Sequence, residues 1–295
     1  MIVGFLKAMP VVMALAVCSG QQAQGQLHRG AGSFVYNDYR PLSDKPVKVW
    51  YYIPSDDPSD LTVVFVMHGM SRTAQGYRDN WKILADKHQL LIIAPEFSKE
   101  LYPDSRSYNL GNMFDENGDP IDETKWSYSI IEPLFDHVKK VTGGTQKSYV
   151  MFGHSAGAQF AHRFLFFKPE NRAHLVVSAN AGWYTIPDPN IDFPYGLKNT
   201  PATLENLRKA FHKKMIIQLG EADNDPNHKS LRRTEEAMLQ GMHRFERGQH
   251  FFRRSIGIAE QINTELHWEI RTVPKAGHRS LEMAGPAATY ILGAN

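Results

Sequence analysis

Cysteine is nearly absent from this sequence, since its 295 residues contain only Cys18. A single thiol cannot form an intrachain disulfide, and a chain cleaved beyond this position would also lack a cysteine nucleophile. Net charge is nearly absent as well, because 33 basic residues oppose 31 acidic residues and leave a balance of +2. So small a balance predicts no binding of nucleic acid and no attraction to anionic lipid.

Long apolar runs are also missing beyond the N-terminus, and we find no solenoid-length repeat and no low-complexity tract. We therefore expect no membrane span. The composition, 42% hydrophobic and 22% charged, is that of a globular protein that buries a substantial core. We expect one large domain over residues 26–295, preceded by a separate segment at 1–25.

That N-terminal segment has the pattern of a secretory signal. Lys7 is followed by an apolar stretch and then by small residues at Ala23 and Gly25, the usual positions before a cleavage site. The sequence thus predicts a secreted or periplasmic protein. The letters LAVC around Cys18 leave lipoprotein anchoring as the less favoured alternative, because Val17 is bulkier than that pattern requires.

The remaining chain alternates apolar, β-branched segments with segments of helical spacing. Strand-like segments occur at 47–53, 62–68, 90–96, 148–152, 174–182, 214–223 and 267–273. Helical spacing occurs at 77–88 and 129–141 and again from Ala156. Such alternation predicts an α/β fold, a mostly parallel sheet with helices on both faces, whose functional residues follow the carboxyl ends of strands.

One of these strand ends carries the letters GHSAG, with Ser155 between Gly153 and Gly157. A strand that turns sharply into a helix brings backbone segments so close that side chains at the flanking positions would clash. Glycines remove that clash and leave the serine exposed near the helix N-terminus, where free N–H groups stabilise negative charge. The spacing and its context predict a nucleophile elbow rather than an ordinary glycine-flanked turn.

A serine nucleophile requires a base and an acid that orients the base. In this kind of fold they follow in the order serine, acid, histidine. Asp223 lies just beyond one predicted strand and His278 beyond the last, so both arrive in that order. Glu221 and Asp225 are rivals for the acid, but Glu221 stands closer to the strand and Asp225 begins an Asp-Pro turn.

His278 is favoured among the histidines that follow Asp223 because it combines a preceding glycine, a strand end and a following helix. The others are His228, His243, His250 and His267. They lie in helical or charged sequence, or at the start of a strand.

Acyl transfer also requires two N–H donors for the oxyanion. The residue after the nucleophile, Ala156, supplies one of them, and the loop after an early strand supplies the other. The letters VMHGM at 66–70 fit that loop, with Met70 as the donor and Ser71 as its neighbouring alternative. We interpret His68 as a structural brace of this loop rather than a catalytic group.

The segments VMHGM, GHSAG, LGEAD and AGHRS resemble the α/β-hydrolase superfamily, from about position 47 to the end of the chain. Within it, the chain is most similar to secreted esterases of the polyhydroxybutyrate-depolymerase and feruloyl or acetyl xylan esterase type. The resemblance implies a serine hydrolase without metal or other cofactor, with Ser155 as nucleophile, Asp223 as acid, His278 as base, and Met70 and Ala156 as oxyanion donors. Many secreted relatives contain disulfides and this chain has none, which bears on the subfamily and not on the three residues.

Two long segments, 96–126 and 180–201, follow strand ends and are expected to form walls of the site. The second contains Trp183 and Tyr184, which suit stacking on a sugar ring or an aromatic acyl group. The alternative is that these aromatic rings pack the loop against the body of the protein.

The sequence therefore predicts a secreted serine esterase for a small or polysaccharide-linked ester. A serine peptidase of the same fold and a binding protein without catalysis are the alternatives. The natural ester and the oligomeric state are not encoded in any of these patterns.

Overall fold

The structure, a computed structural model, describes residue 1 and residues 27–293. The expected signal segment and Cys18 lie outside the described residues. Among those residues no helix combines the length and the apolar character needed to cross a membrane.

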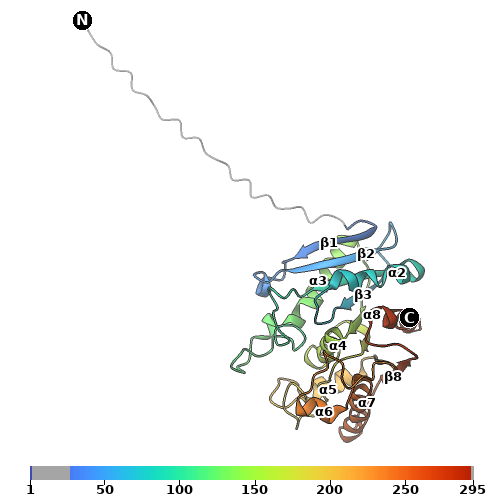
Figure 1. Cartoon of the computed structure of the whole chain (residues 1–295). Coiled ribbons are helices and arrows are strands. Elements are labelled where there is room, and N and C mark those ends of the chain that lie inside the picture. Colours follow the sequence, from blue (N-terminus) through green and yellow to red (C-terminus); the bar gives the residue numbers. More distant parts are fainter. Residues whose placement is uncertain (2–26, 294–295) are drawn as a thin grey trace.

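Eight strands form one sheet with the order β1-β2-β4-β3-β5-β6-β7-β8 (Figure 1). The strands are β1 (Gly30–Tyr36), β2 (Val47–Ile53), β3 (Thr62–Met67), β4 (Leu90–Glu96), β5 (Tyr149–His154), β6 (Ala173–Ala179), β7 (Met215–Gly220) and β8 (Trp268–Val273). The pairings from β4 to β8 are all parallel, whereas β1 pairs with β2, and β2 with β4, in antiparallel register. The mostly parallel α/β sheet predicted from the sequence is confirmed.

Helices cover both faces of this sheet. They are α1 (Ala74–Asp79), α2 (Lys82–His88), α3 (Ile131–Thr142), α4 (Ala156–Phe167), α5 (Leu204–His212), α6 (Glu235–Gln240), α7 (Arg244–Gln261) and α8 (Ser280–Leu292). Short 3-10 turns lie at η1 (Arg40–Leu42), η2 (Glu123–Lys125) and η3 (Ser127–Ile130). Helices α5, α6 and α7 gather toward the β7 and β8 edge, far from β1 (Figure 1).

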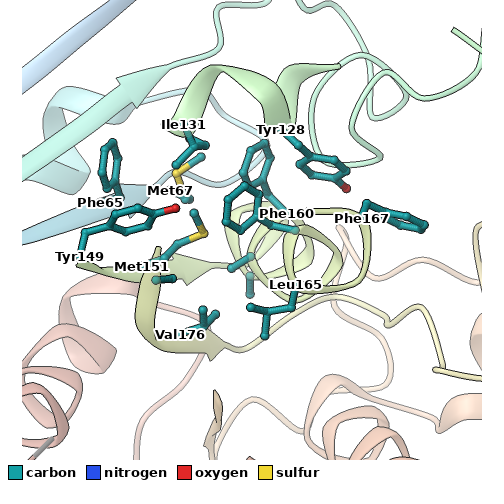
Figure 2. Close-up of a cluster of buried hydrophobic side chains, with 14 of the residues drawn as sticks. Phe65, Met67, Tyr128, Ile131, Tyr149, Met151, Phe160, Leu165, Phe167 and Val176 are labelled. Atoms are coloured by element: carbon teal, nitrogen blue, oxygen red, sulfur yellow. The ribbon is translucent and has the colours of Figure 1, made fainter. Parts of the chain in front are cut away.

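The core divides into two apolar layers because successive side chains of a strand point to opposite faces. On β3, Phe65 packs with α3 and α4 on one face, whereas Val64 packs with α2 and α8 on the other. Figure 2 shows the first layer, in which the rings of Phe65 and Tyr149 meet edge to face at 4.9 Å. Burial on both faces explains why the central strands read as continuous apolar runs.

Two local expectations differ from the structure. The helical spacing at 77–88 corresponds to two helices, α1 and α2, because the chain turns at Trp81, which is fully buried against Phe152. The edge strand β1 was not predicted, since its sequence GAGSFVY lacks a regular apolar alternation. It forms by antiparallel pairing with β2 along its whole length.

Candidate active site

Ser155 occupies a single-residue turn between the end of β5 and the start of α4. Its backbone has φ 59° and ψ −117°, a conformation that costs a residue with a side chain about 1–3 kcal/mol. Two backbone hydrogen bonds hold it there: the Ser155 N–H donates to the Ala179 carbonyl at 3.0 Å, and the Gln159 N–H donates to the Ser155 carbonyl at 3.1 Å. The surrounding fold therefore enforces a strained serine at the carboxyl edge of the sheet.

The glycines on either side of the serine are required by backbone contact. A Cβ atom at Gly153 would lie 2.1 Å from the Gly157 carbonyl oxygen, and one at Gly157 would lie 2.0 Å from the Met67 carbonyl oxygen. Neither neighbour is a side chain that can move aside. The steric reason given for the GHSAG spacing is confirmed.

His278 and Asp223 reach Ser155 from two other loops at the same edge. The His278 Nε2 atom lies 3.0 Å from Ser155 Oγ, and the Nδ1–H donates to Asp223 Oδ2 at 2.7 Å. Asp223 is buried, with 3% of its side chain exposed, and His278 keeps 15% exposed. With Nδ1 protonated toward the carboxylate, Nε2 is free to accept the serine proton, which is the geometry required of a general base.

The rival acids face elsewhere. Glu221 accepts a hydrogen bond from the Thr272 hydroxyl at 2.8 Å, and Asp225 accepts one from the Asn227 N–H at 2.8 Å. Both carboxylates belong to exposed residues. The structure thus brings Asp223, and neither rival, to the histidine.

Asp223 has a second partner that the sequence analysis did not identify. Arg244, at the start of α7, donates to Asp223 Oδ1 at 3.1 Å, so the two carboxylate oxygens are held by different side chains. The same guanidinium donates to Ser230 Oγ at 3.0 Å and lies 3.2 Å from His228 Nδ1. A buried arginine has no local sequence signal, because its burial depends on a partner 21 residues away.

Asn180 joins the loops that carry the acid and the base. Its side-chain N–H donates to the Gly277 carbonyl at 2.9 Å, next to His278, and its Oδ1 accepts from the Gly220 N–H at 2.8 Å. The Ala222 N–H also donates across to Ala276 at 2.9 Å. Asn180 was not predicted from the sequence, where its one signal is an asparagine directly after a strand. Asparagine tolerates the φ of 49° that Asn180 adopts.

The two expected oxyanion donors lie at the same pocket as Ser155. The Ala156 N–H belongs to the first turn of α4, where N–H groups have no partner within the helix. Met70 lies in a tight turn after β3 that is closed by a hydrogen bond from the Arg72 N–H to the Gly69 carbonyl at 3.1 Å.

His68 braces this turn. Its Nε2 accepts from the Phe97 N–H at 3.0 Å, so its Nδ1 carries the proton and donates to the Gly69 carbonyl at 2.9 Å. Complete burial lowers the pKa of His68 to about 3, and the ring stays neutral. These contacts agree with the structural interpretation of His68.

Tyr77 and His154 form a buried pair of side chains next to the serine turn. The Tyr77 hydroxyl packs against Gly69, and its oxygen is 2.9 Å from His154 Nδ1. Burial raises the pKa of Tyr77 to about 12 and lowers that of His154 well below its usual range, so both side chains are uncharged. The His154 ring is 4.8 Å from the His278 ring. The Tyr77–His154 pair therefore connects Gly69, the residue before Met70, with His278.

A pocket of about 190 Å³ opens beside Ser155. Its lining residues are Met70, Ser105, Ser155, Ala156, Gln159, Gly182, Trp183, Ser230, Arg232 and Arg244. Segments 96–126 and 180–201 thus both contribute to its wall, as expected.

The two aromatic residues predicted to bind substrate have different positions. Trp183 lines the pocket with 4% of its surface exposed. Tyr184 is completely buried, stacked on Phe251 at 4.5 Å, and its backbone is held by Gln240. Its ring packs the loop against the body of the protein, so this geometry argues against a substrate contact by Tyr184.

Metal ligands do not cluster in the described part of the chain: within residues 27–293 no three His, Cys, Asp or Glu side chains are grouped to hold an ion.

Comparison with solved structures identifies relatives of this chain. No protein-family model matches the chain, and no curated protein does. Among solved structures, poly(aspartic acid) hydrolase-1 from Sphingomonas sp. KT-1 is 41% identical with a TM-score of 0.88, covering 90% of this chain and all of that one. A poly(3-hydroxybutyrate) depolymerase from Bordetella parapertussis is 32% identical with a TM-score of 0.85, covering 91% and 92% of the two chains.

More distant structures share the fold alone. An S-formylglutathione hydrolase from Agrobacterium tumefaciens is 14% identical with a TM-score of 0.58, covering 91% of this chain and 96% of that one. Because the two nearer relatives exceed 30% identity over nearly their full lengths, the chain belongs to the α/β-hydrolase family of esterases.

Proposed function

We propose that this protein hydrolyses carboxylic esters through an acyl-enzyme formed on Ser155, with His278 as base and Asp223 as its orienting acid. The observation that carries the proposal is the line of two hydrogen bonds, 2.7 Å and 3.0 Å long, that joins the three residues at a strained turn. Each of the three residues follows a different strand, so their alignment is not a consequence of packing within one element.

The reaction follows from this geometry. As Ser155 Oγ attacks the ester carbonyl carbon, its proton moves to His278 Nε2 and the carbonyl oxygen becomes negative. The N–H groups of Met70 and Ala156 stabilise that oxygen. The tetrahedral centre then expels the alcohol, which takes the proton from Nε2 and leaves an acyl group on Ser155.

Water completes the cycle by the same steps. His278 takes a proton from the water as its oxygen attacks the acyl carbon, and the Ser155 oxygen leaves with that proton. The products are a carboxylic acid and the restored serine. Asp223 keeps the imidazole in the required orientation throughout and stabilises its cationic form.

Small soluble esters suit the pocket better than carbohydrate-linked ones. Of the two candidate stacking residues, Tyr184 is buried. The Trp183 ring already contacts two guanidinium groups, which lie 4.3 Å (Arg163) and 4.9 Å (Arg232) from the ring centre. A sugar would have to displace an arginine to stack there. We therefore place short acyl esters ahead of sugar esters.

Amide hydrolysis is the second candidate, and the relative at 41% identity favours it. That relative is named as a hydrolase of poly(aspartic acid), a polymer whose units are joined by amide bonds. The same three residues serve either bond, since His278 protonates whichever group leaves.

A substrate panel separates these candidates. The purified protein and its Ser155→Ala variant are assayed on p-nitrophenyl acetate, poly(3-hydroxybutyrate), acetylated xylan, methyl ferulate, poly(aspartic acid) and a peptide anilide. Serine-dependent turnover of esters alone supports the proposal. Turnover of poly(aspartic acid) or the anilide alone replaces it with the amide reading, and no turnover on any substrate favours a binding protein.

Export is part of the proposal and rests on residues 1–25 alone. Expression of the full chain should release a protein whose N-terminus lies near Gln26 into the periplasm or medium. Retention of Cys18 as a lipid-modified N-terminus would replace secretion by anchoring.

A further inference from the structure

Arg232 is a cation of the pocket whose charge is not neutralised by any carboxylate of the described residues. It lines the pocket together with Ser155 and Ala156, and the described residues of that lining include no aspartate or glutamate. Within residues 27–293, no carboxylate lies within 4.0 Å of its guanidinium. By contrast, Arg244 is paired with Asp223, and Arg247 donates to three backbone carbonyls. An exposed, unneutralised cation beside a nucleophile is open to an anion.

The side chain is held in place without being neutralised. Its Nε–H donates to the Tyr195 hydroxyl at 2.6 Å, and its guanidinium lies 4.9 Å from the centre of the Trp183 ring and 5.5 Å from that of Tyr195. These contacts fix the plane of the guanidinium. In the described residues its two terminal nitrogens donate to no side chain or carbonyl, so one planar edge with two donors remains available.

Arg244, the other arginine of the pocket, is in the opposite situation. It is buried, and its two terminal nitrogens are directed at Asp223, Ser230 and His228. Its Nε is buried out of reach of solvent. Its charge belongs to the acid of the site. A substrate anion would therefore meet Arg232 and not Arg244.

We infer that Arg232 binds a carboxylate carried by the substrate, close to the bond that is cleaved. This inference rests on the proposed function and adds its substrate class: esters, or amides, of acidic molecules. A planar fork of two N–H donors matches a carboxylate in bidentate geometry, and stacking on two aromatic rings orients the fork before the substrate arrives. The relative that is named for poly(aspartic acid), a polymer with one carboxylate on each unit, agrees with such a substrate.

The test compares acidic and neutral esters of the same shape. On the acyl side these are monomethyl succinate and methyl 4-methylpentanoate, and on the alcohol side O-acetylglycolate and isobutyl acetate. For each pair, the ratio of kcat/KM between the acidic and the neutral ester is measured by acid release at constant pH. The ratio cancels changes in folding or in the serine chemistry that affect both esters.

We expect Arg232→Gln to lower this ratio about 10- to 100-fold in at least one pair, the loss typical of one charge-assisted hydrogen-bonded pair. Arg232→Lys should retain part of the preference, because it keeps the charge but not the fork. The matched control is Arg233→Gln. Arg233 is also exposed, donates to the Pro226 carbonyl and is not part of the pocket, so the ratio of this variant should equal that of the unmodified protein.

Two results would overturn the inference: equal ratios in both pairs for Arg232→Gln and the unmodified protein, or an equal fall of the ratio in Arg233→Gln. The pair that responds tells whether the carboxylate belongs to the acyl or to the alcohol part. Failure of the proposed function looks different: either hydrolysis of the four esters would persist in Ser155→Ala, or the unmodified protein would hydrolyse none of them.

Discussion

Among the serine–histidine pairs of the described residues, two lie at opposite ends of the sheet. At the carboxyl end Ser155 lies 3.0 Å from His278, and at the amino end Ser148, just before β5, lies 3.1 Å from His174 on β6. The amino-end cavity is also the larger, about 520 Å³ against about 190 Å³. A serine near a histidine in a cavity therefore does not distinguish the two ends.

The second nitrogen of each histidine does distinguish them. His278 Nδ1 donates to Asp223, whereas His174 Nε2 is buried and has no hydrogen-bond partner among the described residues. Burial and the charge of Lys214 lower the pKa of His174, which disfavours the imidazolium that a base must form. Without a carboxylate, the amino-end pair cannot stabilise the protonated histidine.

The backbone around each serine differs as well. Ser155 sits in the strained turn ahead of α4, next to the N–H of Ala156, whereas Ser148 precedes a strand. A serine–histidine contact is therefore a candidate catalytic site only where a helix N-terminus lies beside the serine and an acidic side chain binds the histidine.

The largest expected effect separates the two serines. Ser155→Ala should reduce kcat by roughly 10⁶-fold, as loss of the nucleophile does in other serine hydrolases, while Ser148→Ala should leave it unchanged. Circular dichroism and thermal unfolding of both variants check that the fold is intact. A comparable loss in Ser148→Ala would abolish the distinction between the ends.

Removal of the acid should make the carboxyl-end pair behave more like the amino-end one. Asp223→Asn is expected to lower kcat by about 10⁴-fold, because the amide no longer favours the required tautomer or the imidazolium. Glu221→Gln is the matched control, since Glu221 faces Thr272, and it should retain full activity. Greater sensitivity at Glu221 would transfer the role of the acid to that residue.

Tyr77 supports only the carboxyl-end pair. Tyr77→Phe should lower kcat by about 10- to 100-fold with little change in KM, because the turn that presents Met70 loses its link to His154. Tyr102→Phe, which removes a buried hydroxyl bonded to the Lys45 carbonyl instead, is the control and should keep its kcat. An equal change in both variants would mean that Tyr77 acts through general stability.

The smallest effect concerns acid stability. His68 and His154 are fully buried with lowered pKa values, so below about pH 6.5 the unfolded chain binds protons that the folded chain does not. The free energy of unfolding should therefore fall as the pH falls, by up to about 1.4 kcal/mol per pH unit for each such histidine. For His68 the fall continues toward pH 3.

Urea unfolding at several pH values measures this slope. His154→Gln should flatten it more than His174→Gln does, because His174 is only half buried. Equal slopes in the two variants would contradict the assignment of His154 as a neutral group in the folded protein.

The strands and the GHSAG turn could be predicted because their signals are local. The two-residue period of side chains and the apolar runs located the seven strands from β2 to β8, and two glycines located the turn. Strand β1 was not predicted, because it depends on pairing with β2 rather than on a pattern in its own sequence.

The sequence by itself determined the α/β order of elements and the candidates Ser155, Asp223 and His278, since short-range sterics and chain order limit where such residues can stand. Only the tertiary structure decided that Tyr184 is buried while Trp183 reaches the pocket, and that Arg244 holds the acid while Arg232 keeps its donors free. The physical reason is that burial and the pairing of a charge depend on residues far apart in the chain. No local pattern specifies which of them meet.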